Sequence, residues 1–169
     1  KLSKDVVIPE RKILLSILEE LRPQIVDQCL MEHEIVNKIG IFIGTRFRVD
    51  VSHAQALEVD PNDIDFNAFY DSGLDENGDV SIELYIITNT NDSFLLIDSA
   101  GFDSIIRRIS DNLTHEIIHM KQSRARDFLE VDDMAYCMVE DELLENQLYL
   151  GSPDEINAYG YNIAQELLD

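Results

Sequence analysis

The feature that most constrains this chain is the pentapeptide His115-Glu116-Ile117-Ile118-His119, which contains two of the four histidines in the sequence. Apolar residues around it recur at helical spacing, so we expect a helix that begins at about residue 102. This apolar stripe consists of Ile106, Ile109, Leu113, Ile117 and Met120. Side chains four residues apart lie on the same face of a helix. His115 and His119 can therefore both direct a ring nitrogen at one metal ion, at about 2.0–2.1 Å.

Glu116 lies one residue further round the helix, where it can contact a metal-bound water rather than the metal itself. A metal ion lowers the pKa of such a water towards ~7, and a carboxylate can take the proton as the water attacks a carbonyl carbon. The alternative is that both histidines are ordinary polar residues of a helix. Two observations favour the metal site: the histidines lie off the apolar stripe, and buried imidazoles require a partner such as a metal.

A third ligand is expected downstream, and Glu155 is the best-placed acid, 36 positions after the second histidine. It opens a helix with a well-defined start, in which Ser152 is the N-cap and Pro153 the first helical residue. Tyr159 follows one turn later on the same face, where it can stabilise an oxyanion. Two alternatives stay open: Asp154 is a rival ligand, or Glu155 completes a capping box with Ser152.

The other histidines do not extend the motif. His33 and His53 lie far upstream at no related spacing, and we interpret both as surface or structural residues, with His53 able to assist only if the fold brings it near. The metzincin pattern HExxHxxGxxH is not met, since Gln122 stands at the glycine position and Ala125 at the third histidine.

The motif and the later glutamate together resemble the gluzincin branch of zinc-dependent peptidases. The residues E-x-x-A-Y-x-x-N-I-A-x-E-L-L from Glu155 onward are similar to small single-domain members of the ImmA/IrrE type. A weaker similarity to the aspzincins, in Gly151 to Glu155 and Tyr159-Gly160, fails because the acid is Glu and the tyrosine lies one residue too far along. The gluzincin resemblance implies zinc bound by His115, His119 and Glu155, with Glu116 as general base. It also implies an α+β, zincin-like fold, with a small twisted sheet packed on the motif helix and a C-terminal helix that carries the third ligand.

The rest of the pattern predicts both helices and strands. A helical period covers residues 9–38, with a kink or break at Pro23. Strands are expected in 45–54, 66–73, 79–89 and 93–98, and the acidic segment 74–78 between the second and third is typical of a hairpin turn. We prefer that interpretation to a calcium loop because Val80 occupies the place of the required glycine.

Two further expectations concern how these elements pack. By analogy with zincins, strand 79–89 or strand 93–98 would be the edge that lines the cleft. The last helix would bury a stripe of apolar residues. This stripe consists of Ile156, Tyr159 or Gly160, Ile163 and Leu167.

Composition narrows the classes of protein. A chain of 169 residues predicts one domain, 1–169, and a net charge of −21 repels nucleic acid and favours basic or neutral peptides. The sequence has no apolar run long enough for a membrane span, and its first residues do not resemble a signal peptide. Cys29 and Cys137 have no ligand spacing, so we expect a reducing, cytoplasmic setting.

Three functions are compatible with these observations. The first is a zinc metallopeptidase that acts on a peptide or protein substrate, with Glu116 as general base. The second is a non-catalytic or regulatory zincin-fold binding protein with a structural metal site. The third is an acidic, partner-binding protein in which the motif is accidental.

Overall fold

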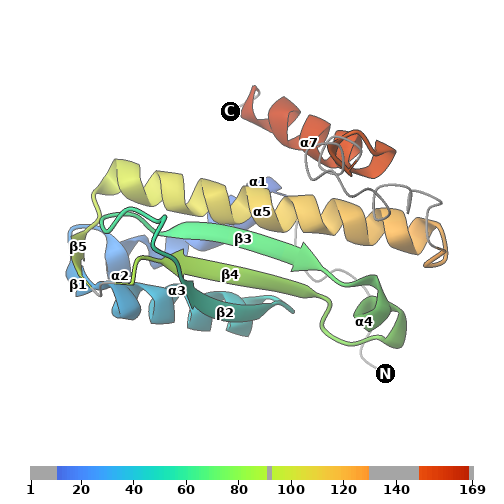
Figure 1. Cartoon of the computed structure of the whole chain (residues 1–169). Coiled ribbons are helices and arrows are strands. Elements are labelled where there is room, and N and C mark those ends of the chain that lie inside the picture. Colours follow the sequence, from blue (N-terminus) through green and yellow to red (C-terminus); the bar gives the residue numbers. More distant parts are fainter. Residues whose placement is uncertain (1–10, 91–92, 130–148, 168–169) are drawn as a thin grey trace.

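The protein has an α+β fold, seen in a computed structural model that describes residues 11–90, 93–129 and 149–167 (Figure 1). A three-stranded sheet has one face buried by helices, and the motif helix runs along one edge of that sheet. The expected mixture of small sheets and helices is confirmed. The predicted start of the first helix, the acidic segment after residue 129 and Cys137 lie outside the described residues.

The main sheet has the order β2-β4-β3, with β2 parallel and β3 antiparallel to β4. Its strands are β2 (Asp50–Gln55), β3 (Asp65–Tyr70) and β4 (Ile82–Thr88). Alternate residues of β4 are buried, as expected for a strand with one face against helices. A separate two-stranded sheet pairs β1 (Cys29–Met31) with β5 (Phe94–Leu96).

The prediction for the edge strand is wrong. Segment 79–89 forms the central strand β4, and segment 93–98 forms β5 in the other sheet. The strand that lies along the motif helix is β3 (Figure 1). Strand order depends on long-range pairing, which the apolar pattern of one segment does not encode.

The N-terminal helical region changes from α to 3-10 geometry just before Pro23 and ends at Ile25. It comprises α1 (Arg11–Leu18), the 3-10 turn η1 (Glu19–Leu21) and α2 (Arg22–Ile25). Pro23 falls in the first turn of α2, where its missing N–H costs no helical hydrogen bond. The chain then forms β1 before it enters α3 (Glu32–Arg46), so the segment contains separate helices, as one of the predicted alternatives had it, with a short strand between them that the sequence did not predict.

The connection between β3 and β4 is longer than the predicted hairpin turn and contains the short helix α4 (Ser72–Asn77). The Asp71 side chain caps it by accepting from the Leu74 N–H at 3.0 Å, and Gly78 ends it with φ of 82°. Asp75 on this helix accepts two bonds from Arg124, at 2.6 and 2.7 Å. The connection is thereby attached to the C-terminal end of the motif helix.

The motif helix is α5 (Ser99–Ala125), capped by Asp98, whose side chain accepts from the Gly101 N–H at 2.7 Å. All five residues of the predicted apolar stripe are buried, which confirms the face assignment. Among the described residues, no helix is both long enough and apolar enough to cross a membrane.

The last helix, α7 (Pro153–Glu166), begins where predicted but packs on a different face. Ile163 is 57% exposed and Leu167 is 82% exposed, so the predicted apolar stripe is wrong. Among the α7 side chains that the structure describes, those of Glu155 and Ala158 are buried instead, and Glu155 faces the histidines of α5.

Candidate metal centre

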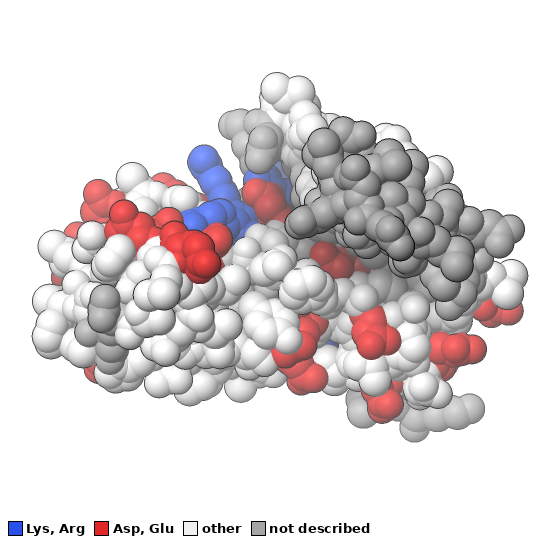
Figure 2. All heavy atoms as spheres, viewed as in Figure 1, with Lys and Arg blue, Asp and Glu red and all other residues white. Residues whose placement is uncertain are grey.

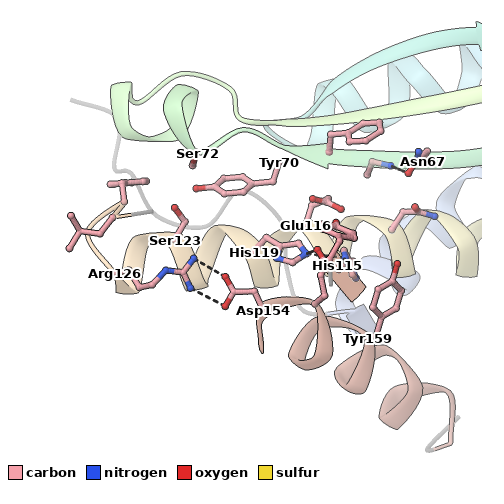
Figure 3. Close-up of a pocket in the computed structure, with 17 residues that line it drawn as sticks. Asn67, Tyr70, Ser72, His115, Glu116, His119, Ser123, Arg126, Asp154 and Tyr159 are labelled. Carbon is pink, nitrogen blue, oxygen red and sulfur yellow. Dashed lines mark hydrogen bonds and ion pairs between the residues drawn. The ribbon is translucent and has the colours of Figure 1, made fainter. Parts of the chain in front are cut away.

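The two histidines of α5 lie side by side on one face of the helix, as their spacing predicts (Figure 3). Their Nε2 atoms are 2.9 Å apart, and both side chains are largely buried. Burial, followed by the influence of His119, lowers the pKa of His115 despite the opposing effect of Glu155. His115 is therefore neutral near pH 7, and neutral imidazole is the form that binds a metal.

Glu155 reaches this pair from α7. Its Oε2 lies 3.3 Å from His115 Nε2, and its Oε1 lies 3.2 Å from His119 Nε2. The Ser152 hydroxyl accepts from the Glu155 backbone N–H at 3.3 Å, so Ser152 is the N-cap as expected. The Glu155 carboxylate, however, points at the histidines and is only 4% exposed. The two interpretations of Glu155 therefore do not exclude each other: its backbone N–H takes part in the helix cap, and its carboxylate faces the histidines.

Asp154, the rival acid, points elsewhere. Its carboxylate makes two bonds with the Arg126 guanidinium, at 2.9 and 2.7 Å, and is directed along α5 toward that arginine rather than at the histidines (Figure 3). This bidentate pair attaches the first turn of α7 to the end of α5.

The donor set fits a metal ion of the zinc type. One ligand atom from each of His115, His119 and Glu155 lies within 4.8 Å of the others. A tetrahedral ion with bonds of 2.0–2.1 Å separates its ligands by about 3.3 Å, close to the histidine–glutamate distances. Glu155 Oε2 is buried and makes no hydrogen bond within the described part of the chain. A cation would supply the partner that this buried oxygen requires.

Gln122 determines which nitrogen of His119 carries the proton. Its side-chain Nε2 donates to the Asp154 backbone carbonyl at 3.3 Å, and a carbonyl oxygen can only accept. Gln122 Oε1 therefore faces His119 Nδ1, at 3.1 Å, and Nδ1 must be the donor. The Nε2 lone pair of neutral His119 is thus free to bind a metal, and this contact is of the kind that orients metal-bound histidines.

Glu116 lies on the sheet side of α5, next to β3 (Figure 3). The backbone N–H of Tyr70 donates to its carboxylate, and this bond lowers its pKa. Burial, followed by the negative charge of Glu155, has the larger effect and raises the pKa of Glu116 to about 8. The carboxylate is held beside the histidines and is not one of the converging ligand atoms.

Two tyrosines of the C-terminal segment border the site. The ring of Tyr159 lies 4.8 Å from the ring of His115, and the hydroxyl of Tyr149 hydrogen-bonds the Glu155 carboxylate. Burial, together with nearby carboxylates, raises the pKa of both phenols, so both carry a proton to donate at neutral pH. The sequence analysis singled out Tyr159 but missed Tyr149, and the only local signal for it is its position three residues before the Ser152 cap.

The site opens into a cleft with a volume of about 430 Å³, formed by β3, α5 and α7. The Asp71 N–H donates to the Ser81 carbonyl, which fixes the hydrogen-bond pattern between β3 and β4. Every second residue of β3, counted back from Tyr70, therefore directs its backbone N–H and carbonyl away from β4. These residues are Phe66, Ala68 and Tyr70. The first two N–H groups donate to the Asp65 and Asn67 side chains, at 2.9 Å each, and the third donates to Glu116.

The remaining histidines do not reach the cleft. His53 lies in β2, at the opposite edge of the sheet, and its Nε2 lies 2.9 Å from Thr88 Oγ1. His33 lies in the first turn of α3. Within residues 11–90, 93–129 and 149–167, the group that could hold a metal consists of His115, His119 and Glu155.

Comparison of the chain with models of known protein families, with curated proteins and with solved structures finds no significant match in any of the three.

Proposed function

We propose that this protein is a zinc-dependent metallopeptidase that hydrolyses peptide bonds, with His115, His119 and Glu155 as the metal ligands. The observation that supports this most strongly is the convergence of three ligand atoms from two helices, beside a fourth residue, Glu116, that is held apart from them. A structural metal site is normally closed by four protein ligands, whereas a catalytic site has three and an open position. Three ligands facing a cleft therefore favour catalysis.

Bound zinc would supply Lewis acidity and would bring the pKa of a coordinated water near ~7. The roles of the chain's own residues follow from their positions. Glu116 is the general base: the positive charge of bound zinc would lower its pKa from about 8, and the carboxylate would then accept a proton and return it to the departing amine. Tyr159, which is protonated, is the donor available to a developing oxyanion, whereas the Tyr149 hydroxyl already donates to the Glu155 carboxylate. Gln122 holds His119 in the tautomer that binds metal.

The edge strand β3 is the proposed binding surface for the substrate backbone. An extended peptide can add to an exposed strand edge by main-chain hydrogen bonds. The outward N–H groups of Phe66 and Ala68 are held only by side chains of the preceding residues, which can rotate away. The arrangement of β3, α5 and α7 supports a zincin-like architecture, with β3 in the role expected of 79–89 or 93–98. The exposed free thiol of Cys29 supports a reducing, cytoplasmic setting.

Metal analysis tests the ligand set. We expect about one zinc per chain in protein purified without added metal, and less than about 0.1 in His115→Ala and Glu155→Ala, since zinc sites with preformed ligands bind tightly. Asp154→Ala is the matched control, because it removes a neighbouring carboxylate that points at Arg126, and it should retain zinc. Zinc loss in Asp154→Ala with retention in Glu155→Ala would contradict the assignment.

Turnover is tested with Glu116→Gln in its zinc-loaded form against a peptide library. We expect cleavage by the wild type to fall by at least about 100-fold in this variant, the size of a general-base contribution. Equal cleavage in both would instead favour the alternative of a binding or regulatory protein that holds a metal without turnover.

A further inference from the structure

A second cavity lies on α5, on the N-terminal side of the metal centre. We call this cavity the basic groove. It has a volume of about 550 Å³ and is lined by three arginines, two aspartates and small residues. The arginines are Arg11, Arg107 and Arg108, and the aspartates are Asp103 and Asp111. Figure 2 shows Lys and Arg side chains gathered over this half of α5, in a chain whose net charge is −21.

The three arginines differ in how far they are neutralised. Arg11 is almost fully buried and pairs with Asp111 at 2.6 Å. Arg108 is bound by Asp63, at 2.8 and 3.2 Å, and lies 3.7 Å from Asp65.

Arg107 is exposed, and no hydrogen bond or ion pair involves it within the part of the chain that the structure describes. Of the two lining aspartates, Asp103 is already paired with Arg22 and Asp111 with Arg11. Among the described residues, the groove therefore has one cation without a carboxylate partner, Arg107, beside two guanidinium groups that aspartates already neutralise.

One residue of the basic groove, Arg108, is in line with the metal centre, whereas Arg107 lines the same cavity from about 100° further round α5. Arg108, Asn112, His115 and His119 succeed one another at intervals of four, three and four residues, which places them on one face of α5. At a rise of about 1.5 Å per residue, Arg108 lies about 10 Å from His115 and about 16 Å from His119 along the helix axis. An extended chain advances about 3.3 Å per residue, so the groove lies three or four residues from a bond cleaved between the histidines.

The direction of β3 decides which end of a substrate would meet the groove. β3 begins at Asp65, beside Arg108, and ends at Tyr70, beside Glu116. A peptide that pairs antiparallel to β3 must run the opposite way, from the Tyr70 end to the Asp65 end. Its residues on the C-terminal side of the cleaved bond therefore approach Arg108, and with it the cavity that Arg107 also lines.

The geometry points to a carboxylate-binding subsite in the basic groove, which selects a negative group three or four residues C-terminal to the cleaved bond. The group is either an acidic side chain or the terminal carboxylate of a short peptide. This inference rests on the proposed peptidase function, and it differs from what net charge alone predicts. The overall field of the protein favours basic peptides, whereas the local guanidinium groups favour an acid at this one position.

The test uses peptides that the zinc-loaded wild type cleaves, resynthesised with Glu or Gln at the third and fourth positions after the bond. Each is made with a free and with an amidated C-terminus, so that the two sources of carboxylate are separated. Arg107→Glu reverses the charge of the groove at an exposed residue. Lys121→Glu is the matched control, since it makes the same change at an exposed position elsewhere on α5.

We expect a carboxylate at these positions to raise kcat/KM about fivefold at low salt, as for one well-placed exposed ion pair. Arg107→Glu should abolish this preference and Lys121→Glu should retain it. Cleavage that is indifferent to the carboxylate, or a preference that persists in Arg107→Glu, overturns the subsite while the peptidase proposal stands.

A second readout, binding of fluorescently labelled versions of the same peptides to metal-free protein by anisotropy, separates the two proposals. If no peptide is cleaved, the proposed function fails. Tighter binding of carboxylate peptides that requires Arg107 would then still support the subsite. Equal binding of the Glu and Gln peptides would overturn it.

Discussion

Gln122 connects the two helices of the candidate metal centre at the level of single hydrogen bonds. It accepts from His119 Nδ1 and donates to the Asp154 carbonyl, one residue before the proposed ligand Glu155. One side chain therefore orients a ligand on α5 and the start of α7 together. The same residue stands where the metzincin pattern requires glycine, so a position that argued against one peptidase type has a defined contact in this chain.

Replacing Gln122 should weaken zinc binding without removing a ligand. We expect Gln122→Leu to lower zinc affinity about 10- to 100-fold, the usual cost of losing a contact that orients a metal-bound histidine. Gln122→Glu retains an acceptor for His119 Nδ1 and should lose less. Competition with a chelating dye measures the affinities, and ¹⁵N NMR of the His119 ring in metal-free protein reports the tautomer. Unchanged affinity and tautomer in Gln122→Leu would contradict this role.

At the scale of elements, α7 is attached to α5 by polar contacts more than by apolar burial. Its buried side chains are those of Glu155 and Ala158, while Ile156 and Ile163 are exposed. The Arg126–Asp154 pair and the contacts of Gln122 and Glu155 supply the remaining attachment. A helix that buries so little apolar surface is expected to open more easily than the sheet.

Removal of metal should therefore loosen α7 selectively. If zinc binds only when α7 is packed on α5, it stabilises that packed state by about 4 kcal/mol when the free zinc concentration exceeds Kd about 1,000-fold. With a chelator, hydrogen exchange of the α7 amides should accelerate at least about tenfold, while the β4 amides change little. Hydrogen exchange followed by mass spectrometry measures the rates in both regions. Chelator-treated Glu155→Ala is the reference, because metal binding does not stabilise α7 in that variant. Equal acceleration in β4 and α7 would show global destabilisation instead.

At the scale of the whole molecule, the net charge of −21 acts against compactness. Like charges repel in the folded state, and ions screen this repulsion over about 8–10 Å at 0.1–0.15 M salt. Ion pairs such as Arg108–Asp63 and Arg46–Glu20 are few beside the 34 acidic side chains, so repulsion should dominate the response to salt.

The midpoint of thermal unfolding should rise as NaCl is increased from 20 to 500 mM. For a chain of this size, each kcal/mol gained corresponds to about 2–4 °C. Circular dichroism of metal-free protein measures the effect without interference from zinc binding. A midpoint that falls with salt would show that the ion pairs outweigh the repulsion.

Local signals sufficed for much of this protein. The 3.6-residue period placed the buried face of α5, the i, i+4 spacing placed both histidines together, and the Ser152-Pro153 pair marked the start of α7. These features depend on neighbours a few residues away, which is why the chain itself determines them. The acid at position 155 could be nominated for the same reason, because a capped helix holds its first turn in a defined place.

Only the tertiary structure shows that Glu155 rather than Asp154 faces the histidines, which face of α7 is buried, and which strand borders the cleft. Each depends on contacts between segments far apart in the chain. Arg126 draws Asp154 away from the histidines, and the pairing order β2-β4-β3 makes β3 the edge. The apolar pattern of α7 misled because polar contacts, including a buried carboxylate that faces two histidines, set its orientation. The periodicity of apolar residues predicts which face of a helix is buried against a hydrophobic core. It does not predict the orientation of a helix whose inward face makes polar contacts.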